Sequence, residues 1–116
     1  MIKTVKIGDQ DVPMMAMAST DIYFNRIFHE DAIKIQTSNN VDEGDIILLF
    51  EKLGFVMAKH AELKDCKAML ALTEDQYIEW LEQFDHSDYI KAVMDIRSVY
   101  DGQKVGASRP KKAKGQ

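Results

Sequence analysis

Histidine and cysteine are the residue types in this chain that most often hold metals or act as nucleophiles. The three histidines, His29, His60 and His86, are far apart, and no pair has the spacing of a helical zinc motif such as HExxH. We expect His60 to be a half-exposed helix residue and His86 to lie in a turn. Cys66 is the single cysteine, which excludes a disulfide within the chain. The neighbouring Lys67 favours a thiolate, but no signature around Cys66 marks a nucleophile, so we predict a passive thiol and no metal site.

Pairs of acidic residues are the other candidates for catalysis. Asp42-Glu43 and Glu74-Asp75 each stand where a helix is expected to begin. The helix dipole favours acids at that end without any general acid–base role. The chain contains no glycine-rich loop of the kind that cradles phosphates. We therefore predict that the protein is not an enzyme and uses no cofactor.

Charge is unevenly distributed along the chain. The net charge is −4, but residues 102–116 contain five of the fifteen bases and no acid, which leaves −9 on residues 1–101. The five bases are Lys104, Arg109, Lys111, Lys112 and Lys114. An acidic body argues against a nucleic-acid surface across the domain. We expect a single domain over residues 1–101 and a flexible basic tail over residues 102–116.

Two further patterns bear on the location of the protein. The N-terminus lacks the apolar run of a signal peptide. No stretch approaches the roughly 18 uninterrupted apolar residues of a membrane span. We therefore expect a soluble protein that stays inside the cell and has no membrane partner.

The elements that would position these residues follow from local patterns. Loose alternation at the N-terminus and the turn residues Gly8-Asp9-Gln10-Asp11 predict a β-hairpin. Pro13 cannot donate to a ladder, so its strand should lie at an edge. Good N-cap residues then introduce a helix over about residues 21–28. The pattern over residues 32–35 fits either a short helix or an extended segment.

The strongest helical signal runs from about Asp42 to Leu63. Most of its apolar residues recur at helical spacing, whereas three fall off that stripe: Ile47, Leu48 and Phe55. Such a wide apolar arc predicts a central helix that is buried on more than one side. Gly54 lowers helix propensity by about 1 kcal/mol relative to alanine, so we expect another element to approach the backbone closely there.

Two shorter amphipathic helices are expected in the last third of the domain. Thr73 and Gln76 form a capping-box pattern, and an apolar stripe follows at Tyr77, Trp80, Leu81 and Phe84. This stripe should face the core, with Trp80 largely buried. A last helix should stop at Asp101-Gly102. The predicted fold class is α+β, with an N-terminal β-hairpin packed on a mainly helical bundle of about four helices.

Three segments, taken in order, resemble the tail assembly chaperones of long-tailed phages of Gram-positive hosts. The first is the hairpin followed by Tyr23 to Ala32, Tyr-Phe-Asn-Arg-Ile-Phe-His-Glu-Asp-Ala, in which His29 stands where the family usually has glycine. The second, Leu53 to Lys59, is similar to a Leu-Ala-Trp-Val-Met-Ala-Lys helix, and the third, Trp80 to Phe84, is similar to Trp-Leu-Asp-Glu-Phe. Together the segments span most of the chain.

The resemblance implies a non-catalytic function in the host cytoplasm. Proteins of this family hold the tape measure protein, recruit tail tube subunits to it and are left out of the finished virion. A tape measure protein is a long helical chain with exposed apolar surface, so an apolar groove would cover it, and many copies along one client favour weak self-association. We predict that Met15, Met17 and Phe55 contact the client because they fall off the core stripes, whereas Met14 should face the core.

The basic tail has several interpretations. Family members are often made in two lengths by a one-base ribosomal slip, and Pro110-Lys111-Lys112 can be encoded by a slippery run of A. The longer form would recruit the tail tube protein. An ordinary solubilising tail has the same composition, and the protein sequence does not distinguish the two. The alternative function is that of a small phage or prophage nucleic-acid-binding accessory protein that acts through this tail, with salt-dependent DNA binding as its signature.

Overall fold

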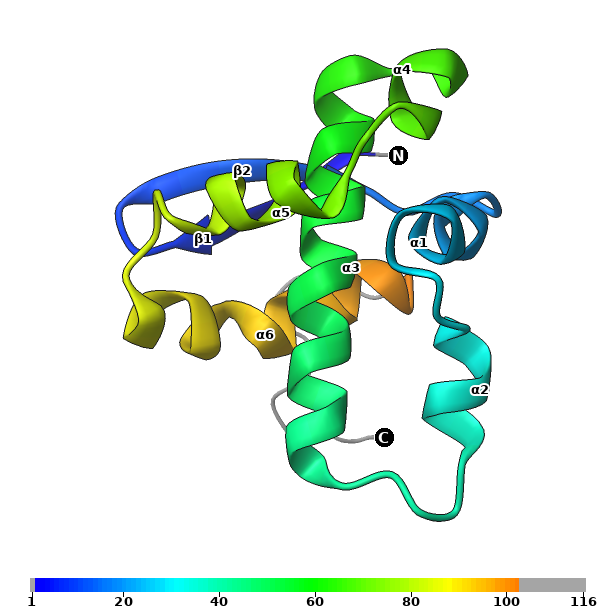
Figure 1. The fold of residues 1–116 in the computed structure, drawn as a ribbon. Coiled ribbons are helices and arrows are strands. Elements are labelled where there is room, and N and C mark those ends of the chain that lie inside the picture. Colours follow the sequence, from blue (N-terminus) through cyan, green and yellow to red (C-terminus); the bar gives the residue numbers. More distant parts are fainter. Residues whose placement is uncertain (1, 103–116) are drawn as a thin grey trace.

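The structure, a computed structural model, describes residues 2–102, which form two strands and six helices (Figure 1). The strands are β1 (Ile2–Ile7) and β2 (Gln10–Met15). The helices are α1 (Thr20–Phe28), α2 (Ala32–Thr37), α3 (Glu43–Leu63), α4 (Cys66–Leu70), α5 (Glu74–Leu81) and α6 (His86–Tyr100). The predicted α+β class, a hairpin on a mainly helical chain, is confirmed. The five basic tail residues lie outside the described residues.

The N-terminal hairpin presents one apolar face to the helices. Its antiparallel strands are joined by a two-residue turn at Gly8-Asp9, where Gly8 has a positive φ of 60°. Alternation along the strands directs three side chains into the core, namely Val5, Ile7 and Met14. Pro13 is exposed on the opposite face. Because the sheet of residues 2–102 has two strands, β2 is an edge strand as Pro13 predicted, and it packs on α3 while β1 packs on α6.

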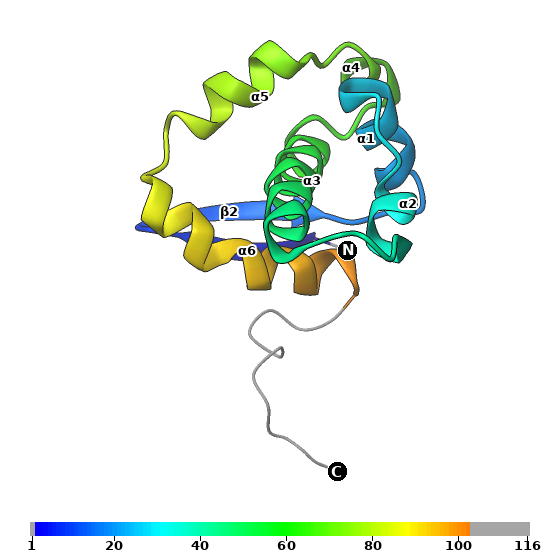
Figure 2. The ribbon, with the colours of Figure 1, turned by 60° about the horizontal axis from the view of Figure 1, so that its bottom comes forward.

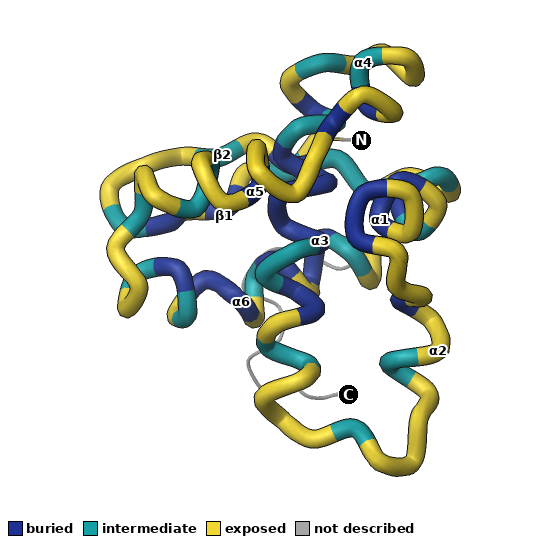
Figure 3. Tube along the Cα trace, in the orientation of Figure 1, coloured by how far each residue is buried: buried dark blue, intermediate teal, exposed yellow. Residues whose placement is uncertain are grey.

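Helix α3 is the central element of the fold. It begins with a reciprocal capping box between Asp42 and Asp45, and every residue from Leu53 to Ala58 is buried. Figure 2 views α3 closer to its axis and shows the hairpin, α6, α1, α4 and α5 around it. Figure 3 shows that burial is concentrated in the middle of α3, while its N-terminal end and the preceding loop are exposed. The prediction of a central helix buried on several sides is therefore confirmed.

Gly54 marks the closest approach between α3 and α6. A Cβ atom placed on Gly54 would lie 2.6 Å from the Tyr89 hydroxyl and 3.1 Å from Cδ1 of Ile96. The Tyr89 hydroxyl donates a 2.7 Å hydrogen bond to the carbonyl oxygen of Glu51, one turn earlier in α3. Glycine is therefore needed because its missing side chain leaves room for this hydroxyl. The predicted role of Gly54 is confirmed.

An aromatic cluster joins α5 to the centre of the fold. The ring of Phe55 lies 5.5 Å from that of Tyr77 and 5.6 Å from that of Trp80, in edge-to-face arrangements. Tyr77 is buried, and Trp80, Leu81 and Phe84 pack against the core while remaining half-buried. The stripe therefore faces the core as predicted. Trp80 is less buried than predicted because the eight-residue α5 lies at the surface and covers α3 from outside.

Two short helices add to the four that the sequence predicted. The undecided segment after residue 31 forms α2, whose first turn is capped by the Asp31 side chain through the Lys34 amide. Helix α4 has five residues and is capped in the same way by Asp65. Such short helices carry no helical period in the sequence, so their N-caps were the signal available.

Candidate functional site

The structure separates the three residues predicted to contact a client. Phe55 is fully buried, so it cannot contact a client and its assignment is wrong. The error arises because α5 covers the side of α3 on which Phe55 lies. Met15 is half-buried at the end of β2, and Met17 is 50% exposed just beyond it. Met14 is fully buried in the core, as predicted.

Met17 lines a shallow hollow at the end of α6. The hollow lies between the β2–α1 connection and residues 99–102, and Lys3 and Ala16 contribute to its wall. Its lining mixes small, polar and charged residues with a few larger ones. Among the described residues of this lining, Met17 is the one large exposed apolar side chain. This hollow offers little apolar surface to a partner.

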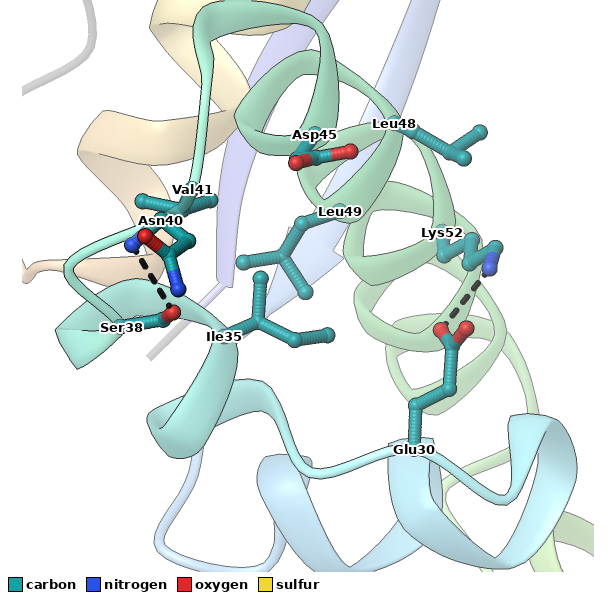
Figure 4. Close-up of a pocket in the computed structure, with 9 residues that line it drawn as sticks. All are labelled: Glu30, Ile35, Ser38, Asn40, Val41, Asp45, Leu48, Leu49 and Lys52. Carbon is teal, nitrogen blue, oxygen red and sulfur yellow. Dashed lines mark hydrogen bonds and ion pairs between the residues drawn. The ribbon is translucent and has the colours of Figure 1, made fainter.

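A more apolar cleft lies between α2 and the N-terminal half of α3 (Figure 4). Its volume is about 290 Å³. Four apolar side chains line it, namely Ile35, Val41, Leu48 and Leu49. In Figure 4, Leu49 and Ile35 point toward one another across its floor, and Leu48 lies at its upper edge. Leu49 belongs to the core, whereas Leu48 is 47% exposed.

Short-range capping builds the walls of this cleft. The Asp31 cap starts α2, and the amide of Asn40 donates a 3.2 Å hydrogen bond to the Ser38 hydroxyl in the loop after it. The capping box at Asp42 and Asp45 then starts α3. Since α2 spans six residues while α3 spans twenty-one, α2 cannot cover the full exposed length of α3. The uncovered part of α3 presents Leu48.

A hydrogen-bond network fixes the position of α2. The Tyr100 hydroxyl at the end of α6 donates a 2.7 Å hydrogen bond to Asp21 of α1 and accepts a 3.2 Å hydrogen bond from Gln36 of α2. Burial and the hydrogen bond to Asp21 raise the pKa of Tyr100 to about 12, so the hydroxyl remains a donor across the physiological range. The network anchors α2 next to Ile35 and so holds one wall of the cleft in place.

An acidic residue lies at each end of the cleft. Asp45 lines it, and Asp42, the N-cap of α3, is joined to Asp45 by reciprocal hydrogen bonds. At the other end, Glu30 accepts a 2.8 Å ion pair from Lys52. Among the nine described residues that line the cleft, Lys52 is the single base. The cleft therefore combines an apolar floor with an acidic rim.

The Lys52 side chain is already engaged. It is 15% exposed, and besides its ion pair its Nζ lies 5.4 Å from the centroid of the Phe28 ring. The side chains of Asp42 and Asp45 each accept a hydrogen bond from the other residue's backbone amide, at a helix end where the dipole favours acids. The charge presented to a partner is therefore negative.

His60 and Cys66 do not form a reactive pair. His60 packs edge-to-face on Tyr23 with ring centroids 5.3 Å apart, its Nδ1 has no hydrogen-bond partner within residues 2–102, and burial lowers its pKa. Cys66 is exposed at the start of α4. Within residues 2–102, no group of three or more histidine, cysteine or acidic side chains is placed to hold a metal ion. The contact between His60 and Tyr23 is therefore a packing contact.

Comparison with known proteins adds no relative of this chain. No protein-family description, curated protein or solved structure matches it. Among the described helices, none is long and apolar enough to cross a membrane.

The sequence did not reveal the cleft, because two residues of α3 that fall off the apolar stripe differ in burial. Leu48 and Phe55 both depart from the main apolar stripe, and the pattern does not say which of them is covered. The structure covers Phe55 with α5 and leaves Leu48 exposed beside α2.

Proposed function

We propose that this protein is a non-catalytic phage tail assembly chaperone whose cleft between α2 and α3 binds a helical segment of the tape measure protein. The observation that carries the proposal is the apolar cleft itself, with Leu48 exposed at its edge and Leu49 on its floor. An amphipathic helix buries its apolar face in such a groove. Covering exposed apolar surface is what would keep a long helical client soluble before tail assembly.

The ordered sequence motifs support the same proposal. Their apolar residues lie mostly in or against the core, where the ring of Phe55 contacts those of Phe28 and Trp80, one residue from each motif. The family's glycine is replaced by His29, and His29 adopts a left-handed conformation with a φ of 58°, which glycine favours. The departure from the motif therefore keeps a turn of the type that glycine would form.

The remaining parts of the proposal concern assembly. The protein would act in the host cytoplasm, associate weakly with further copies along one client, and be left out of the finished virion. A longer, frameshifted form would recruit the tail tube protein. The gene tests that last part directly, since a slippery run of A over Pro110-Lys111-Lys112 followed by an open second reading frame is required. If either is missing, the two-length form is excluded while the chaperone function is unaffected.

Co-expression with the tape measure protein tests the function. We expect the tape measure protein to appear in the soluble fraction with the wild-type protein and to precipitate without it. Leu48→Asp should abolish this effect, because a carboxylate at the edge of the cleft opposes burial of an apolar helix. Leu70→Asp is a matched control, since Leu70 is 46% exposed on α4, outside the cleft. Equal solubility of the client with and without the protein would refute the proposal.

A further inference from the structure

The rim of the cleft carries information about its occupant beyond the apolar floor. Asp45 lines the α3 end with Asp42 hydrogen-bonded beside it, and the one base of the lining, Lys52, is paired with Glu30. An acidic client segment would bring like charges together, which costs free energy and slows association. A client with bases beside its apolar stripe would gain ion pairs at the rim.

From this charge pattern we infer that the cleft selects a basic amphipathic helix, with lysine or arginine flanking an apolar stripe. The inference rests on the proposed function and specifies the segment of the client that is bound. From Asp45 to Lys52 the cleft follows eight residues of α3, whose seven helical rises span about 10 Å. That length accommodates about two turns of a bound helix, with apolar side chains at i, i+3, i+4 and i+7.

The chain's own basic tail fits this description less well. Residues 103–116 supply the bases, but Val105 is their only large apolar side chain, so they have no stripe to cover Leu48 and Leu49. A second copy of the protein would have to offer a basic apolar helix. The exposed Leu70 of α4 lies beside Lys67, yet Glu74 and Asp75 follow close in sequence. A foreign helix that carries both bases and a stripe meets both requirements of the cleft.

Two synthetic peptides test the inference. Both are helical peptides of about 18 residues, long enough to form a helix in water with favourable residues. They share one leucine stripe and differ in its flanks, which are lysine in one and glutamate in the other. Binding to the full chain is measured by fluorescence anisotropy. We expect the lysine peptide to bind about tenfold more tightly at about 0.01 M salt, and the difference to shrink at about 1 M salt, where charges are screened.

Leu48→Asp separates cleft binding from simple charge attraction. The substitution makes the protein more acidic, so attraction by charge alone would strengthen binding of the lysine peptide. Binding in the cleft should instead weaken at least about tenfold, because the apolar contact is lost. Leu70→Asp changes the net charge equally outside the cleft and should leave binding intact. Circular dichroism melts confirm that both variants fold.

Several results would overturn the inference. Equal affinity for the two peptides, or lysine-peptide binding that survives Leu48→Asp, would show that the rim does not select bases. A large gain in lysine-peptide affinity on removal of residues 103–116 would make the tail the occupant, and self-association that depends on Leu48 would make it a second copy. If the tape measure protein is solubilised without regard to Leu48, the chaperone function holds while its assignment to this cleft fails. If the lysine peptide binds but the client stays insoluble, the proposed function fails.

Discussion

Replacing Gly54 with alanine tests how α3 and α6 pack together. The new methyl carbon would lie 2.6 Å from the Tyr89 hydroxyl, a separation that the structure must relieve. The hydroxyl is the far end of a side chain, but moving it breaks its 2.7 Å hydrogen bond to Glu51. Tyr89 is also 3% exposed, so it has little space into which it can move.

The magnitude follows from three opposing contributions. Overpacking of a core costs about 1–3 kcal/mol, and the lost hydrogen bond costs about 1 kcal/mol. Alanine stabilises the helix by about 1 kcal/mol relative to glycine, which offsets part of the loss. We therefore expect Gly54→Ala to lower the free energy of unfolding by about 2 kcal/mol, or a melting temperature lower by about 10 °C for a domain of this size.

A double-mutant cycle identifies the hydroxyl as the cause. Tyr89→Phe alone should cost about 1 kcal/mol, because the Glu51 carbonyl keeps its helical partner. With the hydroxyl gone, Gly54→Ala should be almost neutral, since the remaining contact is the mobile Cδ1 methyl of Ile96 at 3.1 Å. The expected coupling energy between the two sites is about 2 kcal/mol, measured by urea denaturation of all four proteins.

Gly44 provides the matched control. It lies in the first turn of the same helix, and an added Cβ would meet one atom within 4 Å, Oδ1 of Asp42 at 3.3 Å. Gly44→Ala should therefore be neutral or slightly stabilising. Additive effects of Gly54→Ala and Tyr89→Phe would refute the reasoning, because they would show that the hydroxyl is not what the alanine displaces.

Four further predictions concern separate parts of the domain. His29→Gly should stabilise the protein by about 0.5–1 kcal/mol in urea denaturation, because a side chain disfavours the left-handed backbone, and destabilisation would show that the His29 side chain matters more. Trp80→Ala should cost about 2 kcal/mol by the same assay, less than full burial would give, and a loss below about 1 kcal/mol would make Trp80 a surface residue. Burial lowers the pKa of His60 from its ordinary value of 6.5, so the unfolded chain binds the proton more readily and stability should fall as pH drops below 6.5. His60→Gln should flatten the melting temperature between pH 7.5 and 5.5, and an unchanged profile would refute this origin. A chain ending at Gly102 should melt at nearly the full-length temperature, because the removed residues contain one large apolar side chain, and a drop of many degrees would show that they dock on the domain.

Features with a local chemical cause were predictable from the sequence. The capping box of Thr73 and Gln76 forms as predicted, with the amide of Thr73 donating to Gln76 at 2.9 Å. Gly102 ends α6 with a φ of 78°. The need for a close neighbour at Gly54 was also readable, because a glycine inside an apolar helix is unfavourable unless something approaches it. Each of these depends on a few adjacent residues or on one backbone position.

The environment of individual apolar side chains was not predictable in the same way. Whether Phe55, Leu48 or Trp80 is exposed depends on where α5 and α2 pack on α3, and that is decided by contacts between distant parts of the chain. A wide apolar arc indicates that a helix is central, but it does not show which part of that helix its neighbours leave uncovered. The candidate cleft lies beside the uncovered N-terminal part of α3, so the periodicity of α3 could not locate it.

The cleft lies where α3 leaves the core, so a residue at its edge can contact a client without being part of the core. The buried part of α3 runs from Leu49 to Ala61, with the hairpin, α1, α5 and α6 around it, whereas Leu48 projects from the uncovered N-terminal part. Leu49 belongs to both regions, since it is 2% exposed and also lines the floor of the cleft. A change at Leu49 would therefore disturb the core and the cleft together. A change at Leu48 alters surface that is already half in water, so a loss of client binding there is a loss of contact with the client.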